Sequence, residues 1–411
     1  MNIVVQKFGG TSVRNLECQR QVMQKVLRSH REGNKVIVVL SAMSGETNRL
    51  LALADEWSDT PDAAEVDSMV STGEQVSCAL FAMLLKKQGI HCRSVLGFQA
   101  PIRTDSAFGK ARITDINTRH LLEMLEEYDI LVMAGFQGAD ENNRITTLGR
   151  GGSDTSAVAL AAAVDADVCE IYTDVPGVFT TDPNMCDDAR KIERIAYDEM
   201  LEMASMGAKV LQIRSVEFAK KYNVTVHVRS TFSDELGTIV TQEDETMESV
   251  LVSGIAYDKD QSQITLVHVQ DKPGVSAQIF SPLAEKKILV DMIVQNPSKD
   301  GKTDMTFTVP RADVEQTIKT LEALQYEIGF EKLTSNLNVS KISIIGVGMR
   351  NHSGVASLAF QALADENINI LMISTSEIKV TCLIDDKYTE LAVRTLHKAF
   401  HLEEAETIDQ S

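Results

Sequence analysis

The chain has 411 residues, 44% of them hydrophobic. It can therefore bury two or three cores, because a single core stops growing at roughly 250 to 300 residues. The formal net charge of -19 argues against nucleic acid as a partner, since a phosphate backbone needs a basic face. No stretch has the apolar length of a membrane span, and the start MNIVVQK lacks the pattern of a signal peptide.

The cysteines form no CxxC pair and lie among apolar neighbours. This usage is typical of reduced structural thiols, so we expect a cytoplasmic protein without disulfides. The residues concerned are Cys18, Cys78, Cys92, Cys169, Cys186 and Cys382.

The first motif is KFGGTSV, residues 7–13, directly after an apolar strand candidate at residues 3–5. Gly9 and Gly10 allow backbone N–H groups to approach an anion, and Lys7 adds a positive charge. A helix should follow, with Leu16 and Met23 among its apolar positions. The pattern indicates a phosphate site, although paired glycines after a strand also make plain tight turns.

Two further segments also place polar or charged residues in turns next to a predicted strand or helix end, where a ligand could bind. LGRGGSD, residues 148–154, places Arg150 and glycines before an alanine-rich helix, although Ser153 or Asp154 could simply cap that helix. TDVPGVFTTDP, residues 173–183, follows a buried strand candidate, and Asp174 stands at its carboxyl end, where open parallel sheets keep their ligand groups.

These motifs, with STGE at residues 71–74 and GAKVLQIRSVEFA at residues 207–219, resemble those of aspartate kinases, members of the amino acid kinase family. The resemblance spans the chain. It implies transfer of the ATP γ-phosphoryl group, with Mg²⁺ carried by the nucleotide, to the side-chain carboxylate of L-aspartate. An ionised carboxylate needs no general base, which fits a sequence in which no Ser-His-Asp order or metal-ligand cluster stands out.

The resemblance also implies roles for single residues. Lys7, Asp174 and Lys209 would be catalytic, with Lys7 on the phosphoryl group and Asp174 holding the lysines. A guanidinium suits the substrate α-carboxylate and a carboxylate suits its ammonium. The implied substrate-binding residues are Thr47, Glu74, Arg150 and Ser153. The implied nucleotide-binding residues are Lys7, Gly9, Gly10, Thr173, Asp174, Phe179, Asp182, Asn184, Lys209 and Val210. Asn184 departs from the arginine that many relatives carry there.

The organisation of the chain changes after about Gly237. Before it, strands alternate with helical patterns, which predicts an α/β domain of three layers with a mainly parallel sheet. Residues 241–249 are polar and acidic and read as a linker. Beyond them, residues 264–296 align with residues 342–376, with Gly274 matching Gly354 and Val290 matching Ile370. A repeat of this length indicates a duplicated small domain.

The two copies resemble ACT domains, ferredoxin-like βαββαβ modules that bind amino acids. The resemblance implies that the first copy is inserted into the second. We therefore predict a kinase domain at 1–240, a linker at 241–249, ACT domain 1 at 264–337, and a discontinuous ACT domain 2 at 250–263 plus 338–411. The expected effectors are lysine, threonine or both. The implied allosteric residues are Asp271, Gly274, Asp291, Gln295, Val355, Ala356, Asn369, Ile370, Ser376 and Glu377.

Two other functions stay open at this point. A kinase-like chain with weak catalysis could serve as an amino-acid-sensing regulatory subunit, and another amino acid kinase could use glutamate or a nucleotide as acceptor. Because Lys7, Glu74 and Lys209 are all present in this chain, we favour a catalytically active, feedback-controlled aspartate kinase over both alternatives. Because ACT modules present open edges, we expect a homo-oligomer, and Met247 offers an internal start for a short regulatory chain.

Overall fold

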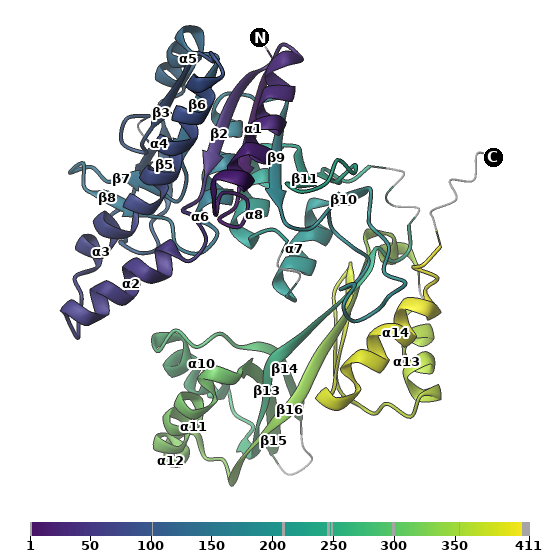
Figure 1. Ribbon diagram of the computed structural model, residues 1–411. Helices are drawn as coiled ribbons and strands as arrows, with labels where there is room; N and C mark the ends of the chain where they lie inside the picture. The colour runs from purple at the N-terminus through teal and green to yellow at the C-terminus, as the bar shows by residue number, and fades with distance from the viewer. Residues whose placement is uncertain are drawn as a thin grey trace. The chain divides into compact units, whose positions relative to one another are not determined.

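A computed structural model describes residues 2–100, 102–207, 210–244, 247, 250–297, 301–352 and 354–404 (Figure 1). The chain forms two compact units. The N-terminal unit comprises Met1–Val178 and Lys191–Met247. The C-terminal unit comprises Phe179–Arg190 and Glu248–Ser411. The short segment Phe179–Arg190 therefore belongs by its contacts to the C-terminal unit, whereas the sequence-based boundaries place it in the kinase domain.

The N-terminal unit is built on an eight-stranded sheet in which only β11 and β12 run antiparallel to each other. Strands such as KVIVVL and ILVMA are apolar throughout, as expected for parallel strands covered on both faces. In sheet order the strands are β10 (Arg194–Ala196), β12 (Thr238–Thr241), β11 (Val226–Ser230), β9 (Val168–Thr173), β1 (Ile3–Phe8), β2 (Lys35–Leu40), β6 (Ile130–Ala134) and β3 (Cys92–Val95).

Helices cover both faces of this sheet, which confirms the predicted three layers. On one face α1 (Leu16–Arg31) and α4 (Thr72–Lys87) share a hydrophobic core with β2 and β6. On the other, α6 (Gly152–Ala163) packs on β1 and β9 and contacts α8 (Ile213–Tyr222), which contacts α7 (Tyr197–Ser205). The remaining helices are α2 (Glu46–Trp57), α3 (Ala63–Val70) and α5 (Thr118–Glu127).

The helix after KFGGTSV forms as predicted, but two of its side chains differ from expectation. Leu16 is exposed, because it occupies the first position of α1, before the helix reaches the core. Lys25 is buried, which is rare for a lysine unless it is paired, and it donates to Ser233 O at 2.6 Å and to Asp234 Oδ1 at 2.8 Å. Lys25 therefore connects α1 to the segment after β11 through these two hydrogen bonds.

One stretch of the described chain, Ala63–Lys87, has the length and composition of a membrane span, contrary to the sequence-based expectation. It comprises α3 and α4, and half of its apolar window is buried inside the protein. Phe81 and Leu85 of α4 lie in the core with α1. This packing is that of core helices.

A small four-stranded sheet lies beside the main sheet in the N-terminal unit. Its order is β5 (Ile113–Ile116), β4 (Ile102–Thr104), β7 (Gln137–Ala139) and β8 (Ile145–Thr147). Buried Asp67 of α3 fixes it, because the carboxylate accepts from Thr147 N and Oγ1, both at 2.7 Å, and from Gly109 N at 2.9 Å.

The C-terminal unit contains one six-stranded sheet, shared by both halves of the repeat (Figure 1). Its order is β14 (Asp291–Pro297), β15 (Lys302–Pro310), β13 (Gly254–Gln270), β16 (Lys332–Ile345), β18 (Lys379–Asp385) and β17 (Ile370–Thr375). The helices are α10 (Val275–Glu285), α11 (Val314–Ala323), α12 (Gln325–Ile328), α13 (Val355–Asp365) and α14 (Thr389–Ala399), with 3-10 turns η1 (Arg311–Asp313), η2 (Val347–Asn351) and η3 (Asp386–Tyr388).

The long strands β13 and β16 serve both copies of the repeat. The second half of β13 with α10, β14, β15, α11 and the first half of β16 makes one βαββαβ unit. The second half of β16 with α13, β17, β18 and α14 makes the other, whose missing fourth strand is the first half of β13.

Two hydrophobic cores follow the same division. One joins Val252 and Ile255 to residues of β16, α13, β18 and α14, and the other lies between Ile264 and Phe330. This is the arrangement that a discontinuous second domain requires. The exact boundaries stay a prediction.

Candidate active site

Several of the predicted site residues lie around the carboxyl ends of four neighbouring strands, β9, β1, β2 and β6. Lys7 lies in β1 itself, one residue before its end, and Asp174 follows β9. Glu74 of α4 accepts from Ala42 N, after β2, and Ser153 of α6 lies against Gly135, after β6.

The carboxyl ends of these four strands are in register, with Phe8 of β1 opposite Leu40 of β2 and Tyr172 of β9, and Leu40 opposite Ala134 of β6. In open α/β sheets ligands bind at this edge, where connections leave in opposite directions.

The first glycine loop follows β1. A Cβ on Gly10 would lie 2.8 Å from Ala42 O, so only glycine lets this loop pass the segment after β2. A Cβ on Gly9 would meet only Lys7 Nζ, at 3.5 Å, which leaves room beside the lysine. Ser12 Oγ lies 2.7 Å from Thr231 Oγ1 and ties the loop to the segment after β11. The loop thus offers backbone amides and a cation to an anion.

Lys7 pairs with Asp154, with 2.5 Å between Nζ and Oδ1. Both side chains are nearly buried. Asp154 lies in the first turn of α6, whose N-cap position is occupied by Gly151 at φ 71°, so neither Ser153 nor Asp154 is the cap. The sequence analysis did not assign this partner role to Asp154. The pair fixes Lys7 at the sheet edge.

Arg214 of α8 binds the start of the second glycine loop, residues 148–154. Its guanidinium donates to Leu148 O at 2.5 Å and to Ala111 O at 3.1 Å. Arg150 at the tip of this loop is exposed and bonds to no other residue that the structure describes. Ser153 is buried against Gly135, where a Cβ would lie 2.8 Å from Ser153 Oγ. The loop therefore presents a free guanidinium beside a fixed hydroxyl.

Glu74 of α4 is a buried carboxylate with one unused oxygen. Its Oε1 accepts from Ala42 N at 3.1 Å, and within the described part of the chain Oε2 has no hydrogen-bond partner. Loss of hydration raises the pKa of Glu74 to about 7, and the Ala42 N–H offsets part of this rise. Thr47, in the first turn of α2, is half-buried. A buried carboxylate of this kind suits a ligand cation.

Thr173 is the last residue of β9, and Asp174 follows it. Thr173 O accepts from Thr231 N at 2.9 Å, and Thr173 Oγ1 donates to exposed Asp174 Oδ1 at 3.0 Å. The carboxylate beside Lys7 is Asp154. Lys209 lies outside the described residues, so the predicted role of Asp174 in orienting the lysines stays a prediction. Val210 is half-buried and precedes α8, which begins only at Ile213.

The remaining predicted nucleotide residues, Phe179, Asp182 and Asn184, belong to the C-terminal unit. Asp182 and Asn184 form a turn in which Asp182 Oδ1 accepts from the backbone and the side-chain nitrogen of Asn184, both at 2.9 Å. Asp182 thus caps this turn, and the Asn184 side chain donates to the same carboxylate oxygen.

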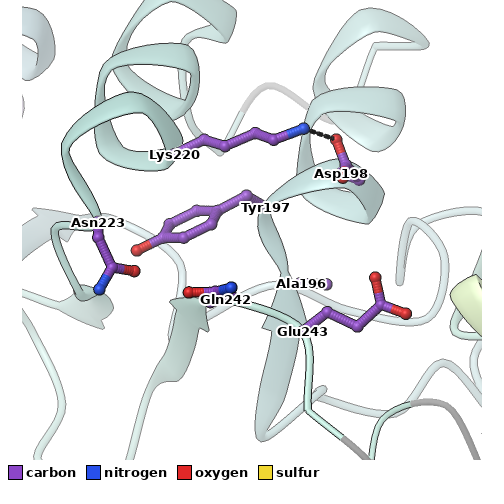
Figure 2. Close-up of a pocket in the computed structure, with 7 residues that line it drawn as sticks. All are labelled: Ala196, Tyr197, Asp198, Lys220, Asn223, Gln242 and Glu243. Carbon is purple, nitrogen blue, oxygen red and sulfur yellow. Dashed lines mark hydrogen bonds and ion pairs between the residues drawn. The ribbon is translucent and has the colours of Figure 1, made fainter.

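A separate cavity of about 260 Å³ lies in the N-terminal unit (Figure 2). Its lining includes Tyr197, Asn223 and the ion pair between Lys220 and Asp198, whose charged atoms lie 2.6 Å apart. Asn223 precedes β11, so the cavity lies at the amino ends of the parallel strands, opposite the edge that carries Lys7. None of the predicted site residues lines it.

In the C-terminal unit the predicted effector residues lie at matching places in the two copies: the turn before α10 and the start of α13, and the strands β14 and β17 with the residues that flank β17. Gly274 caps α10 at φ 91° with open space around it, whereas Gly354 adopts φ -93°, so the two matching turns differ in backbone conformation. β14 and β17 are the sheet's edge strands, yet Met292 of β14 and Met372 of β17 share a hydrophobic cluster.

Asp291, at the start of β14, pairs with buried Lys341 of β16 at 2.5 Å. Partial burial raises the pKa of Asp291, but the Lys341 ammonium more than offsets it and the pKa lies below its usual value. The sequence analysis missed Lys341, which no motif marks. Gln295, Asn369, Ser376 and Glu377 are exposed.

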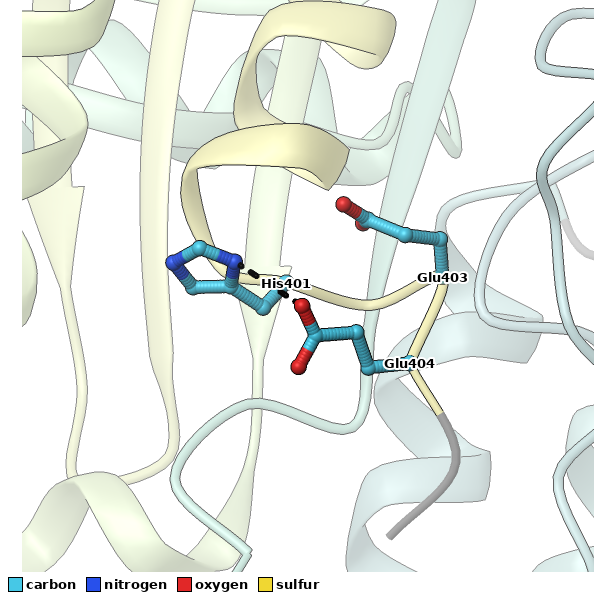
Figure 3. A group of neighbouring side chains, drawn as sticks. All are labelled: His401, Glu403 and Glu404. Carbon is cyan, nitrogen blue, oxygen red and sulfur yellow. Dashed lines mark ion pairs between the residues drawn. The ribbon is translucent and has the colours of Figure 1, made fainter.

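One group in the described chain has the composition of a metal site: exposed His401, Glu403 and Glu404 in the C-terminal unit (Figure 3). His401 Nδ1 and Glu404 Oε1 lie 3.7 Å apart. Exposed acidic groups of this kind are common without an ion.

Comparison with known proteins gives a consistent result. The sequence profile of the amino acid kinase family matches residues 2–230, and ACT domain profiles match residues 263–326 and 342–400. The chain is 53% identical to an aspartate kinase of Pseudomonas putida over 98% of both chains. It is 51% identical to an aspartokinase of Helicobacter pylori over 98% of this chain and 100% of the relative.

Solved structures agree. Escherichia coli aspartokinase III in complex with aspartate and ADP superposes with a TM-score of 0.78 at 28% identity, covering 97% of this chain and 99% of the other. The same enzyme in complex with lysine and aspartate gives a TM-score of 0.77 at 28% identity and the same coverage.

Proposed function

The chain belongs to the aspartate kinases of the amino acid kinase family, and on that premise we propose that it transfers the γ-phosphoryl group of ATP to the side-chain carboxylate of L-aspartate. The products are 4-phospho-L-aspartate and ADP. The observation that carries this proposal is the buried carboxylate of Glu74, whose Oε2 has no hydrogen-bond partner among the described residues. Its Oε1 accepts from Ala42 N, just beyond the carboxyl end of β2, the neighbour of the strand that contains Lys7. An amino-acid ammonium is the cation that such a group would bind.

Each remaining polar group has a task in this reaction. Arg150 would hold the aspartate α-carboxylate, with Thr47 and Ser153 as hydrogen-bonding neighbours. The substrate's side-chain carboxylate attacks phosphorus as an anion, so no general base is required. Lys7 would bridge the phosphoryl group as negative charge shifts onto the leaving oxygen, and Asp154 keeps its ammonium in place.

The nucleotide would bind with its phosphates on Gly9, Gly10 and Lys7. Lys209 and Val210 would lie near them, and Asp174 would hold the lysines in position. The base and ribose would lie near Thr173, Phe179 and Asp182, with Asn184 following in the same turn. Asp174 is an exposed carboxylate at a strand end, a donor of the type that Mg²⁺ takes beside phosphate oxygens and water. Bound Mg²⁺ would neutralise part of the phosphate charge.

We propose further that lysine, threonine or both inhibit the enzyme through the ACT copies, as feedback on the first step toward lysine, threonine, methionine and isoleucine. The E. coli enzyme solved with lysine supports this choice. Asp271, Gly274, Asp291 and Gln295 would contribute from one copy. Val355, Ala356, Asn369, Ile370, Ser376 and Glu377 would contribute from the other.

We also propose that the enzyme acts in the cytoplasm as a homo-oligomer joined by its ACT domains. Met247 is the last residue of the N-terminal unit, so a chain started there would carry nearly all of the C-terminal unit. It would lack only Phe179–Arg190.

The experiment that tests the function is hydroxamate formation with ATP, Mg²⁺ and hydroxylamine. We expect product from aspartate and none from glutamate. Equal product from glutamate would reject the substrate assignment. No product from either amino acid, in a folded protein that binds lysine or threonine, would favour the alternative of an amino-acid-sensing regulatory subunit.

A further inference from the structure

The N-terminal unit contains a second cavity, between the helices α2 and α3, which contact each other (Figure 1). Its volume is about 440 Å³, inside the range of about 300 to 1,000 Å³ that is usual for ligand sites. Its lining is almost entirely apolar and includes Leu53 and Trp57 of α2, Val66 and Met69 of α3, and Pro61 between the two helices. Of the predicted site residues that the structure describes, none lines it. The proposed reaction therefore does not account for this cavity.

Trp57, the last residue of α2, is 83% exposed beside the cavity. Helix α2, every residue of which the structure describes, buries only Leu50, and Leu51 is exposed as well. Tryptophan is highly buried in most proteins, and at protein interfaces it is among the residues that contribute most binding energy. An exposed tryptophan next to an apolar cavity therefore indicates a surface for another molecule.

The cavity lies between two helical stripes of side chains. Leu53 and Trp57 occupy positions i and i+4 of α2, and Val66 and Met69 occupy positions i and i+3 of α3, so each helix turns one stripe toward the cavity. A further helix can fill a groove of this kind with apolar residues at i, i+3, i+4 and i+7. The arrangement of the lining thus favours a helix as the occupant.

Carboxylates surround the apolar lining. Asp55, Glu56 and Asp59 are exposed, and none of them forms an ion pair with a residue that the structure describes. Glu65 also lines the cavity, and its Oε1 pairs with Arg144 Nη2 at 2.7 Å. The rim of the groove therefore has an excess of negative charge.

A partner that fits this groove must bring positive charge. Residues 50–85 contain no lysine, arginine or histidine, so α2 after Arg49 and α3 supply no cation of their own. A second copy of a chain with a net charge of -19 would bring more carboxylates, and an anionic lipid surface would be repelled by those already present. Lysine and arginine beside the apolar stripe of a helix complement both the lining and the rim.

We propose that the groove between α2 and α3 is a docking site for an amphipathic helix of another protein, with an apolar stripe flanked by lysine and arginine. The apolar stripe packs on Trp57 and Val66, and the cations lie against Asp55 and Asp59. Trp57 is the anchor, because it offers the largest exposed apolar side chain of the groove. The inference does not rest on the proposed reaction, since no substrate or nucleotide residue takes part.

The test uses the fluorescence of the full-length protein. Trp57 is the single tryptophan of the chain, so its emission reports on this groove alone. The probe is a synthetic peptide of about 18 residues, about five helical turns, with leucine at i, i+3, i+4 and i+7 and lysine elsewhere. We expect a saturable shift of the Trp57 emission to shorter wavelength at micromolar peptide, with weaker binding as salt is added. The same peptide with glutamate in place of lysine should cause no shift.

Two variants locate the binding. Val66→Asp places a carboxylate among the apolar lining and should weaken binding of the lysine peptide by about tenfold or more. Val76→Asp is the matched control, because Val76 is an exposed valine of α4 outside the groove, and it should leave binding unchanged. Asp59→Lys changes the charge at an exposed position without disturbing the packing, and it should weaken binding by about three- to tenfold at low salt. An unchanged circular dichroism spectrum shows that each variant is folded.

Unchanged affinity for the lysine peptide in both Val66→Asp and Asp59→Lys would overturn the inference, as would equal binding of the glutamate peptide. A Trp57 shift on raising the protein concentration alone, with self-association that Val66→Asp abolishes, would assign the groove to a second copy instead. A shift with phosphatidylglycerol vesicles but not with the peptide would assign it to a lipid surface. None of these outcomes depends on hydroxamate formation, so failure of the docking site and failure of the proposed function are distinguishable.

Discussion

Replacing Glu74 by Gln should stabilise the protein while it weakens aspartate binding. Burial raises the pKa of this carboxyl from 4.5 to about 7. The folded state therefore holds the proton more tightly than the unfolded state, and wild-type stability falls as the pH rises from 4.5 to 7. A shift of this size corresponds to about 3 kcal/mol at most, at 1.36 kcal/mol per pKa unit. Glutamine keeps the shape and removes the titration.

Calorimetric unfolding of wild type and Glu74→Gln at pH 5 and pH 8 measures this effect. The variant's advantage should be small at pH 5 and should grow by about 2 to 3 kcal/mol at pH 8. Glu56→Gln, at an exposed position of α2, is the control and should show no such growth. An advantage that does not change between the two pH values would refute the argument that Glu74 is an ionisable group held out of water.

The same titration predicts a kinetic profile. Only ionised Glu74 pairs with the aspartate ammonium, so kcat/KM for aspartate should rise about tenfold between pH 6 and pH 8 with an apparent pKa near 7. Glu74→Gln should lose this rise and have a much higher KM for aspartate. A wild-type profile that is flat over this range would contradict the assigned role.

Four further outcomes test the other assignments. Lys7→Ala should lower kcat by several powers of ten, about 3 to 4 kcal/mol or more, with an unchanged circular dichroism spectrum, and near-normal turnover would remove Lys7 from the site. Arg150→Ala should raise the KM for aspartate strongly, so an unchanged aspartate dependence would exclude it as a ligand. Gln295→Ala should relieve inhibition by lysine or threonine at an unchanged maximal rate, a coupling of about 1 to 3 kcal/mol, whereas loss of both activity and inhibition would indicate a structural role. Native mass spectrometry of the complex made from the unmodified gene should show a chain that begins at Met247, and full-length chains alone would reject the internal start.

The sequence predicted the three-layer domain and the two repeats because both rest on periodic apolar patterns and glycine turns. Lys7 and Glu74 were predicted from motifs. The structure places Lys7 near the carboxyl end of β1 and Glu74 in α4, where it accepts from Ala42 N after the neighbouring strand β2. The pairing of Lys7 with Asp154 was not predicted, because two residues 147 positions apart meet only through sheet order. Local spacing contains no information about that order.

Other features depended on tertiary contacts in the same way. Phe179–Arg190 continues from a kinase strand without any break in composition, and only its hydrogen bonds to β13 and α14 assign it to the C-terminal unit. The matched glycines Gly274 and Gly354 look equivalent in the alignment but differ in φ, at 91° and -93°, and a 3-10 turn, η2, precedes only the second.

The sharing of β13 and β16 imposes an order on folding during synthesis. Ile264 of β13 pairs with Ser335 of β16, so the inserted copy is complete once β16 begins to emerge from the ribosome. Gly254, at the start of β13, must wait for Ile345 and for the helices beyond it. Until then the first half of β13 is an exposed strand edge, open to pairing with a neighbouring nascent chain. For the same reason the inserted copy could be removed and its ends rejoined, whereas the outer copy cannot be cut out as a single continuous piece.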